Sequence, residues 1–118
     1  MSARIENELG YIHIDNEVLA SIAGISAMEC YGLVGMSTKS TASGLVELLK
    51  RENMSKGVKV NTANNEINVD LFIVVEFGTR ISTVAKNIIE KVKYNLENLT
   101  GMKVRNVNIN VQGVRVEK

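Results

Sequence analysis

The chain has 118 residues, 45% hydrophobic and 23% charged, values typical of one folded domain with its own core. Fourteen Lys and Arg residues are balanced by thirteen Asp and Glu residues, so the net charge gives no general attraction for nucleic acid or an anionic membrane. The single cysteine excludes an internal disulfide, and no apolar run approaches the roughly 20 residues that span a bilayer. We therefore expect one domain over residues 1–118, in a reducing cytoplasm, with membrane association only through a partner.

The first half of the chain predicts a strand, a helix, a second strand and a second helix. Residues 10–14 alternate in polarity, with Ile12 and Ile14 on one side, as in a half-buried strand. Asp15 follows as a potential N-cap of a helix over about residues 16–29, whose apolar residues recur at helical spacing. Residues 33–36 predict a short strand, and residues 41–53 a short amphipathic helix after a polar loop over 37–44.

A hairpin is predicted where the apolar segments 58–62 and 67–77 flank Asn64 and Asn65. Asparagine tolerates the positive φ angles that a two-residue turn requires. With this turn, four cross-strand pairs are expected: Val60 opposite Val69, Val58 opposite Leu71, Lys59 opposite Asp70, and Asn61 opposite Asn68. The segment 71–75 is apolar on both faces, which is typical of a central strand covered on both sides or of an interface.

A long last helix begins after Thr79, a potential cap, and ends at Gly101. Its apolar stripe consists of Ile81, Val84, Ala85, Ile88, Val92, Leu96 and Leu99. Residues 102–111 alternate again, but Val104 is out of phase, so we expect a bulge near Arg105 and Asn106. The order is β-α-β-α-β-β-α-β, and the long crossover helix covers one sheet face. The predicted fold class is α+β, a two-layer sandwich of a mixed sheet with helices packed on one face.

The residues that could carry catalysis do not form a recognisable site. His13, the only histidine, stands in a strand beside Asp15, and a surface histidine explains it better than a catalytic pair, because no spacing adds a nucleophile or second ligand. Cys30 falls at a helix C-terminus, where the dipole disfavours a thiolate. One His and one Cys cannot supply three metal ligands of these types, and no nucleotide-binding glycine motif occurs. We expect no catalytic residue, metal or cofactor; an enzyme that uses Cys30 or His13 ranks last.

A KH-like nucleic-acid-binding module is the main alternative. Residues 32–35 match the G-x-x-G spacing of the loop with which KH domains hold RNA, and basic residues gather in the last strand. Leu33 and Val34, however, are typical of strand core, and acidic residues interleave with the basic ones. Nucleic-acid binding is therefore disfavoured.

Three groups of segments carry a family resemblance. They are Gly10 to Leu19 with Ile22-Ala23, then Val69-Asp70-Leu71, and finally Leu99 to Val104 with Val107 to Val114. Over nearly the whole chain, these segments resemble the alkaline shock protein family, the Gls-type envelope stress response proteins of Gram-positive bacteria. The chain ends at Lys118 without the charged extension of longer members, so it is similar to the short, housekeeping type. The resemblance implies a non-enzymatic cytoplasmic protein of envelope homeostasis, in some members held near the membrane by an anchoring partner.

These observations predict an interaction or scaffold protein. It would self-associate or bind a protein partner, membrane-anchored in some members of the family, without inserting into the membrane itself. Phe72 and Val74 are the candidate contact residues, because they lie in the segment that is apolar on both faces.

Overall fold

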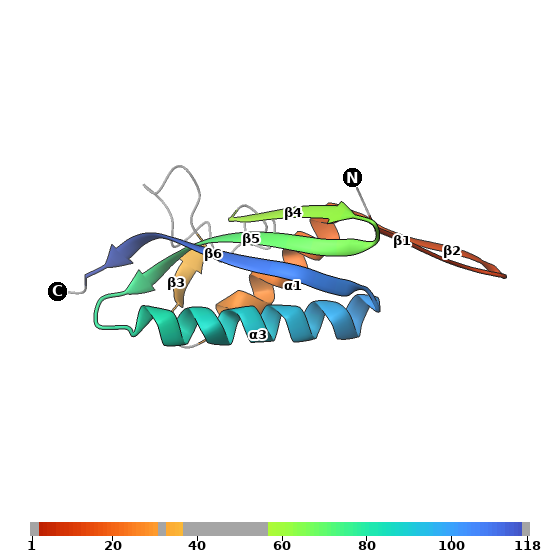
Figure 1. The fold of residues 1–118 in the computed structure, drawn as a ribbon. Helices are drawn as coiled ribbons and strands as arrows, with labels where there is room; N and C mark the ends of the chain where they lie inside the picture. Colours follow the sequence, from red (N-terminus) through yellow and green to blue (C-terminus); the bar gives the residue numbers. More distant parts are fainter. Residues whose placement is uncertain (1–2, 31–32, 37–56, 117–118) are drawn as a thin grey trace.

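The computed structural model describes residues 3–30, 33–36 and 57–116. Their elements are β1 (Ala3–Asn7), β2 (Gly10–Ile14), α1 (Asn16–Met28), β3 (Leu33–Met36), β4 (Val58–Ala63), β5 (Glu66–Glu76), α3 (Ile81–Thr100) and β6 (Lys103–Arg115). Strands β3 to β6 form one mixed sheet with α1 and α3 on one face, and β1 pairs only with β2 (Figure 1). The predicted α+β class is therefore confirmed. The loop and helix expected over 37–53 lie outside the described residues.

Strand β5 is the centre of the mixed sheet. Antiparallel β4 and β3 follow one another along one edge of β5, and parallel β6 occupies the other edge. Helix α3 is the crossover that a parallel pair requires. The turn between β4 and β5 has φ angles of 55° at Asn64 and 61° at Asn65. All four predicted cross-strand pairs are present, so the hairpin register is confirmed.

Two bulges interrupt β6. Ile67 of β5 pairs with Val104 and the next residue, Asn68, pairs with Asn106, so Arg105 is the extra residue of the predicted bulge. A second shift leaves Gln112 unpaired between Val111, the partner of Ile73, and Gly113, the partner of Val74; the residue pattern does not predict this bulge. Each bulge restores the alternation, which keeps the apolar residues of β6 on the side of the helices.

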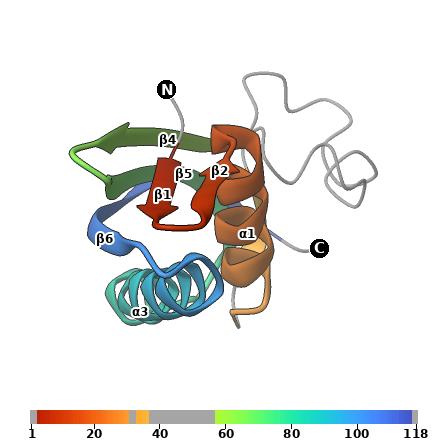
Figure 2. The same ribbon diagram turned by 90° about the vertical axis from the view of Figure 1, so that its right-hand side faces the viewer.

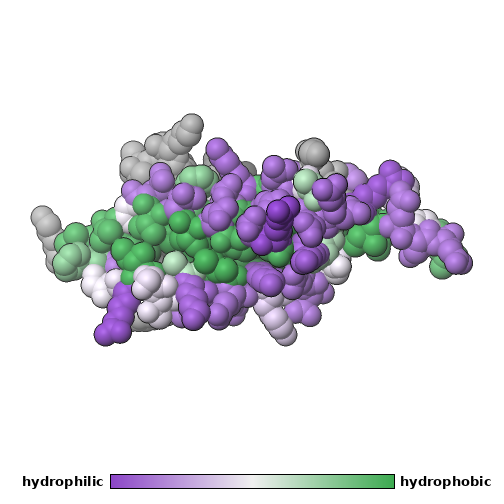
Figure 3. Space-filling model, viewed as in Figure 1, coloured by the Kyte–Doolittle hydropathy of each residue, from purple (hydrophilic) through white to green (hydrophobic). Residues whose placement is uncertain are grey.

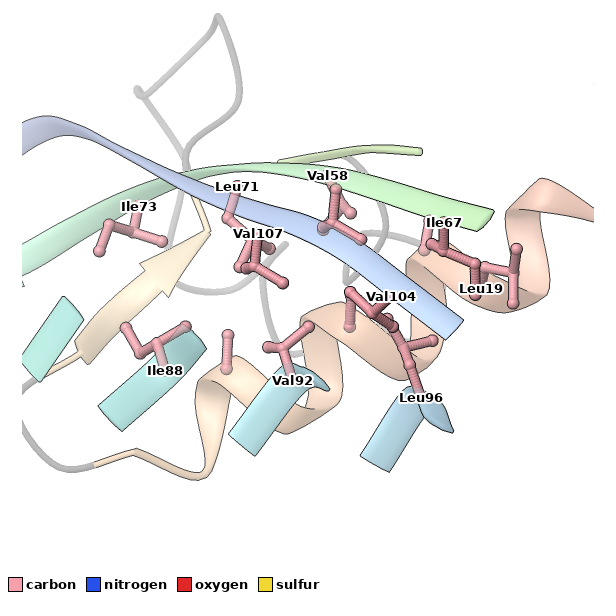
Figure 4. Packing of buried hydrophobic residues seen from close by; sticks show 14 of the residues in the cluster. Leu19, Val58, Ile67, Leu71, Ile73, Ile88, Val92, Leu96, Val104 and Val107 are labelled. Carbon is pink, nitrogen blue, oxygen red and sulfur yellow. The ribbon is translucent and has the colours of Figure 1, made fainter. Parts of the chain in front are cut away.

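The hydrophobic core lies between the sheet and the two helices (Figure 4). Five alternate residues of β5 are at most 1% exposed: Ile67, Val69, Leu71, Ile73 and Val75. Helix α3 packs Val84, Ile88, Val92 and Leu96 against them, and α1 adds Leu19, Ala20, Ala23 and Ala27. Each buried aliphatic side chain contributes roughly 1.5–3 kcal/mol, so this layer supplies most of the stability.

The helix ends differ from the predicted caps. Arg80 rather than Thr79 occupies the N-cap of α3, and no side chain caps that helix. Asp15 does occupy the N-cap of α1, but its backbone carbonyl, not its carboxylate, accepts the N–H bonds of the first turn. The predicted C-cap is confirmed, since Gly101 has φ 76° and donates its N–H to the carbonyl of Glu97. These ends are therefore fixed by backbone hydrogen bonds.

Two members of the predicted α3 stripe do not enter the core: Ile81 in the first turn, which is 42% exposed, and Leu99 in the last turn. Leu99 is 71% exposed, whereas the next residue, Thr100, is buried. The Thr100 hydroxyl donates to the carbonyl of Leu96 and accepts the N–H of Met102. The last turn therefore faces the sheet with Thr100, and the expectations for Ile81 and Leu99 are wrong.

The N-terminal strand is more exposed than predicted and has a partner strand. The residue pattern does not predict β1, because this strand carries a single large apolar residue, Ile5. Ile12 of β2 is 54% exposed, because the β1–β2 hairpin projects beyond the two layers instead of joining the sheet (Figure 1). In the view along the long axis, the hairpin stands in front of the sheet and the helices (Figure 2). The expectation of a half-buried strand is therefore wrong at Ile12, although Ile14 packs at the edge of the core.

Candidate protein-interaction surface

The two helices pack on the same face of the sheet, so alternate residues of β5 point to a second face. We call this second face the open face. It consists of the even-numbered residues of β5 between 66 and 76 and of their register partners on β4 and β6. Along β5 the pattern is regular, with buried residues on the helix side and half-buried residues on the open face. The open face consists of Lys59, Asn61, Asn68, Asp70, Phe72, Val74, Asn106, Asn108 and Asn110, together with the strand ends.

Amide side chains connect the strands across one half of the open face. The Nδ2 of Asn106 donates to Oδ1 of Asn68 at 3.0 Å, and the Nδ2 of Asn108 donates to Oδ1 of Asp70 at 2.8 Å. Lys59 of β4 pairs with Asp70 in register. The Nδ2 of Asn110 donates to the backbone carbonyl of Leu71 at 3.3 Å. This amide ladder satisfies part of the hydrogen-bonding capacity of these side chains, and its bonds at Asn106 and Asn108 lie at exposed positions.

Phe72 and Val74 form the apolar half of the open face. The Phe72 ring is half-buried, and the Nζ of Lys59 lies 5.7 Å from its centroid. Val74 pairs with Gly113 of β6, whose missing side chain leaves the Val74 methyl groups without a large neighbour on that side; a Cβ at Gly113 would lie 3.9 Å from Val74 Cγ2. The structure thus places both predicted contact residues on the same face, side by side along β5.

The candidate catalytic residues do not converge on this face. Nδ1 of His13 lies 3.6 Å from Oδ1 of Asp15 on the N-terminal hairpin, and both side chains are exposed. Cys30 is half-buried beyond the end of α1; burial raises the pKa of its thiol, while Lys91 lowers it and Glu29 raises it. At neutral pH the thiol is therefore protonated, the less nucleophilic form. Within the described ranges, no cluster of His, Cys, Asp and Glu could hold a metal ion.

The residues that suggest a KH-like module do not form an exposed basic loop in the described part of the chain. Leu33 to Gly35 belong to strand β3 rather than to an exposed loop, and Gly32 lies outside the described residues. Of the basic residues in β6, Lys103 and Arg105 approach the carboxylate of Glu66 at 3.9 and 3.8 Å. Neutralisation by Glu66 weakens the attraction of this edge for phosphates.

Comparisons with known proteins place the chain in context. The model of the alkaline shock protein 23 family, described as having a cell envelope-related function, matches residues 4–116. YloU of Bacillus subtilis (strain 168) is 47% identical over 117 residues, which are 98% of each chain. A protein named stress response regulator gls24 homolog, from Streptococcus pyogenes serotype M3 (strain ATCC BAA-595 / MGAS315), is 25% identical over all of this chain and 64% of its own length.

A likeness to a solved structure concerns the fold alone. The chain described as MamM CTD C267S has a TM-score of 0.50 and 12% sequence identity, over 83% of this chain and 95% of that chain. In the part of the chain that the structure describes, no helix has the length and apolar character needed to cross a membrane.

Proposed function

Because this chain belongs to the alkaline shock protein 23 family, with its cell envelope-related function, we propose that it is a non-enzymatic scaffold protein whose open face binds a protein partner. The observation that carries the proposal is the pair Phe72 and Val74, half-buried on the face that α1 and α3 leave uncovered. Apolar contacts at the centre and polar groups at the rim are typical of protein interfaces. The amide ladder and Lys59 supply that rim.

The chemistry of the open face defines the partner. An apolar side chain of the partner would pack against Phe72 and Val74, and carboxylates or carbonyls of the partner would pair with Lys59 and the exposed asparagine side chains. A membrane-anchored partner would bring this cytoplasmic protein to the envelope, in line with the stress-response name of the longer relative. Self-association is the second contact that we propose.

The test is affinity purification of the tagged protein from its native cells, with and without nuclease. We expect the wild type to retain an envelope protein after nuclease treatment, and Phe72→Asp/Val74→Asp to lose it, because buried aspartates at the centre of an interface remain unpaired. Asn87→Asp is the matched control: it adds the same charge at an exposed position of α3, away from the open face, and it should retain the partner.

Circular dichroism and thermal unfolding establish that each variant is folded. A folded double variant with unchanged partners would show that the open face is not the binding surface. Recovery of nucleic-acid-binding proteins that disappears with nuclease would instead support the KH-like alternative.

A further inference from the structure

The N-terminal hairpin forms an arm, which we define as residues 3–14. Ile5 and Ile14 pack at the edge of the core and hold the base of the arm. Beyond this base the arm is exposed: Leu9 at the turn is 98% exposed, Tyr11 62% and Ile12 54%. The two strands make their extensive contacts with each other rather than with the body. An apolar tip is therefore presented to solvent.

Internal contacts give the arm a defined shape. Oδ1 of Asn7 accepts the backbone N–H groups of Leu9 at 2.8 Å and Gly10 at 3.1 Å. The guanidinium of Arg4 lies 4.1 Å from the centroid of the Tyr11 ring, and its Nε lies 2.9 Å from Oε2 of Glu6. A preorganised segment loses less entropy on binding, whereas an isolated two-stranded hairpin is marginally stable in water. Both properties fit a segment that becomes covered by a partner.

A second exposed apolar cluster lies where β5, α3 and β6 meet, and we call it the Phe77 end. The N–H of Phe77 donates to the carbonyl of Arg115 at 2.8 Å, which brings the β5–α3 turn against the end of β6. The cluster is exposed to between 42 and 72% and consists of Phe77, Ile81, Val114 and Val116. In the space-filling view, hydrophobic side chains gather over β6 toward this end of the molecule (Figure 3).

The arm and the Phe77 end cannot cover each other within one molecule. They lie at opposite ends of the long axis, along which the molecule measures 58 Å (Figure 1). Their charges are complementary: Glu8 lies at the turn of the arm next to Glu6, which pairs with Arg4, whereas the exposed Arg80 and Arg115 flank the Phe77 end, and Glu76 precedes Phe77 in the sequence. Opposite charges of this kind favour encounter and correct orientation.

We propose that the arm of one copy docks on the Phe77 end of a second copy. Leu9 and Ile12 would contact Phe77 and Val114, and the arm carboxylates would face the arginines. The contact is heterologous, so each added copy presents a free arm and a free Phe77 end, and association continues in one direction. A contact made by one hairpin falls below roughly 1,200 Å², so assembly would depend on protein concentration. The proposal does not involve the open face.

Two variants that add acidic side chains separate the two halves of this contact. The arm variant is Leu9→Glu/Ile12→Glu, and the end variant is Phe77→Glu/Arg80→Glu, so the two altered surfaces also repel each other. All four side chains are exposed, so neither variant removes a core contact. Lys93→Glu, on the exposed side of α3, is the control for a change of charge away from both surfaces.

Sedimentation velocity is measured on each protein over a range of concentrations and on the mixed variants. We expect wild type and Lys93→Glu to form larger species as concentration rises, and each variant alone to associate at least about tenfold more weakly. An equimolar mixture of the two variants should recover association as a one-to-one dimer that does not grow, because only one arm and one Phe77 end remain functional.

The mixture distinguishes the proposal from other arrangements. Wild type that stays monomeric throughout, variants that associate normally, or a mixture that forms no dimer would overturn it. Binding of the Phe77 end to anionic lipid vesicles, without self-association, would also overturn it. Phe72→Asp/Val74→Asp should assemble like wild type, so the outcome is independent of the scaffold proposal. Hydrogen exchange adds a second readout: amides of residues 9–12 should become more protected as concentration rises only if the arm is covered by another copy.

Discussion

The two faces of β5 show how one strand divides its residues between stability and recognition. On the covered face, Leu71 and Ile73 are fully buried against the helices, whereas Phe72 and Val74 between them are half-buried on the open face. Both pairs are apolar, and their backbone hydrogen bonds belong to the same ladders. The difference lies in what packs against them. A residue's contribution to folding therefore follows from the layer it faces, and residues left without such a layer are available for a partner.

The strongest test of this comparison is Leu71→Ala. The substitution removes a fully buried side chain between the sheet and the helices, and we expect it to lower the free energy of unfolding by about 2–5 kcal/mol. Urea denaturation monitored by circular dichroism measures the change. Asn68→Ala on the open face is the control, with an expected loss of about 1 kcal/mol or less. Equal losses at the two positions would contradict the division between the faces.

The features that depend on local chemistry can be predicted from the sequence. Asn64-Asn65 determines a turn, and the turn determines the register of β4 and β5, because a shift by one residue would turn the apolar side chains to the wrong face. The bulge at Arg105 can also be predicted, because an extra residue there explains why Val104 is out of step with the alternation of Val107, Ile109 and Val111. The same alternation identifies Phe72 and Val74 as members of one face.

The features that depend on packing between distant segments cannot be predicted from the sequence. Nothing in residues 3–7 indicates a strand except Ile5, and alternation in residues 10–14 does not reveal that the strand leaves the body. At Leu99, helical spacing alone suggests burial, but the last turn of α3 presents Thr100 to the sheet instead. The candidate surface follows the same rule: sequence finds its residues, whereas only the positions of α1 and α3 show which face stays open.

A smaller effect is expected from Asn108→Ala in the amide ladder. This substitution removes the bond from Asn108 Nδ2 to Asp70 Oδ1, which lies at an exposed position. Because solvent replaces the lost partner, the free energy of unfolding should fall by about 0.5–1 kcal/mol, measured by urea denaturation. Asn98→Ala, which removes an exposed bond from Asn98 Nδ2 to the carbonyl of Tyr94 on α3, is the matched control. A loss comparable to that of Leu71→Ala would mean that the open face also carries the fold.

The smallest effect concerns Cys30, a reporter at the edge of the covered layer. Its side chain packs against the core cluster, and burial raises the pKa of its thiol above the ordinary value. Iodoacetamide reacts with the thiolate, so alkylation near pH 8 should be slower in the native protein than in the urea-unfolded chain. The midpoint of the native rate profile should lie at higher pH. The sequence contains no other cysteine, so the whole reaction reports on this site.

The sign of the linked stability change follows from the same shift in pKa. Below the ordinary thiol pKa both states are protonated and Cys30 has no effect, whereas above it the unfolded chain ionises first and stability decreases until the native thiol also ionises. Lys91→Met is the informative control, because Lys91 lowers the Cys30 pKa, and its removal should slow native alkylation further. If the native and unfolded chains are alkylated at the same rate and with the same pH midpoint, Cys30 is as accessible to solvent in the native protein as in the unfolded chain. The contrast between covered and open faces would then not extend to the end of α1.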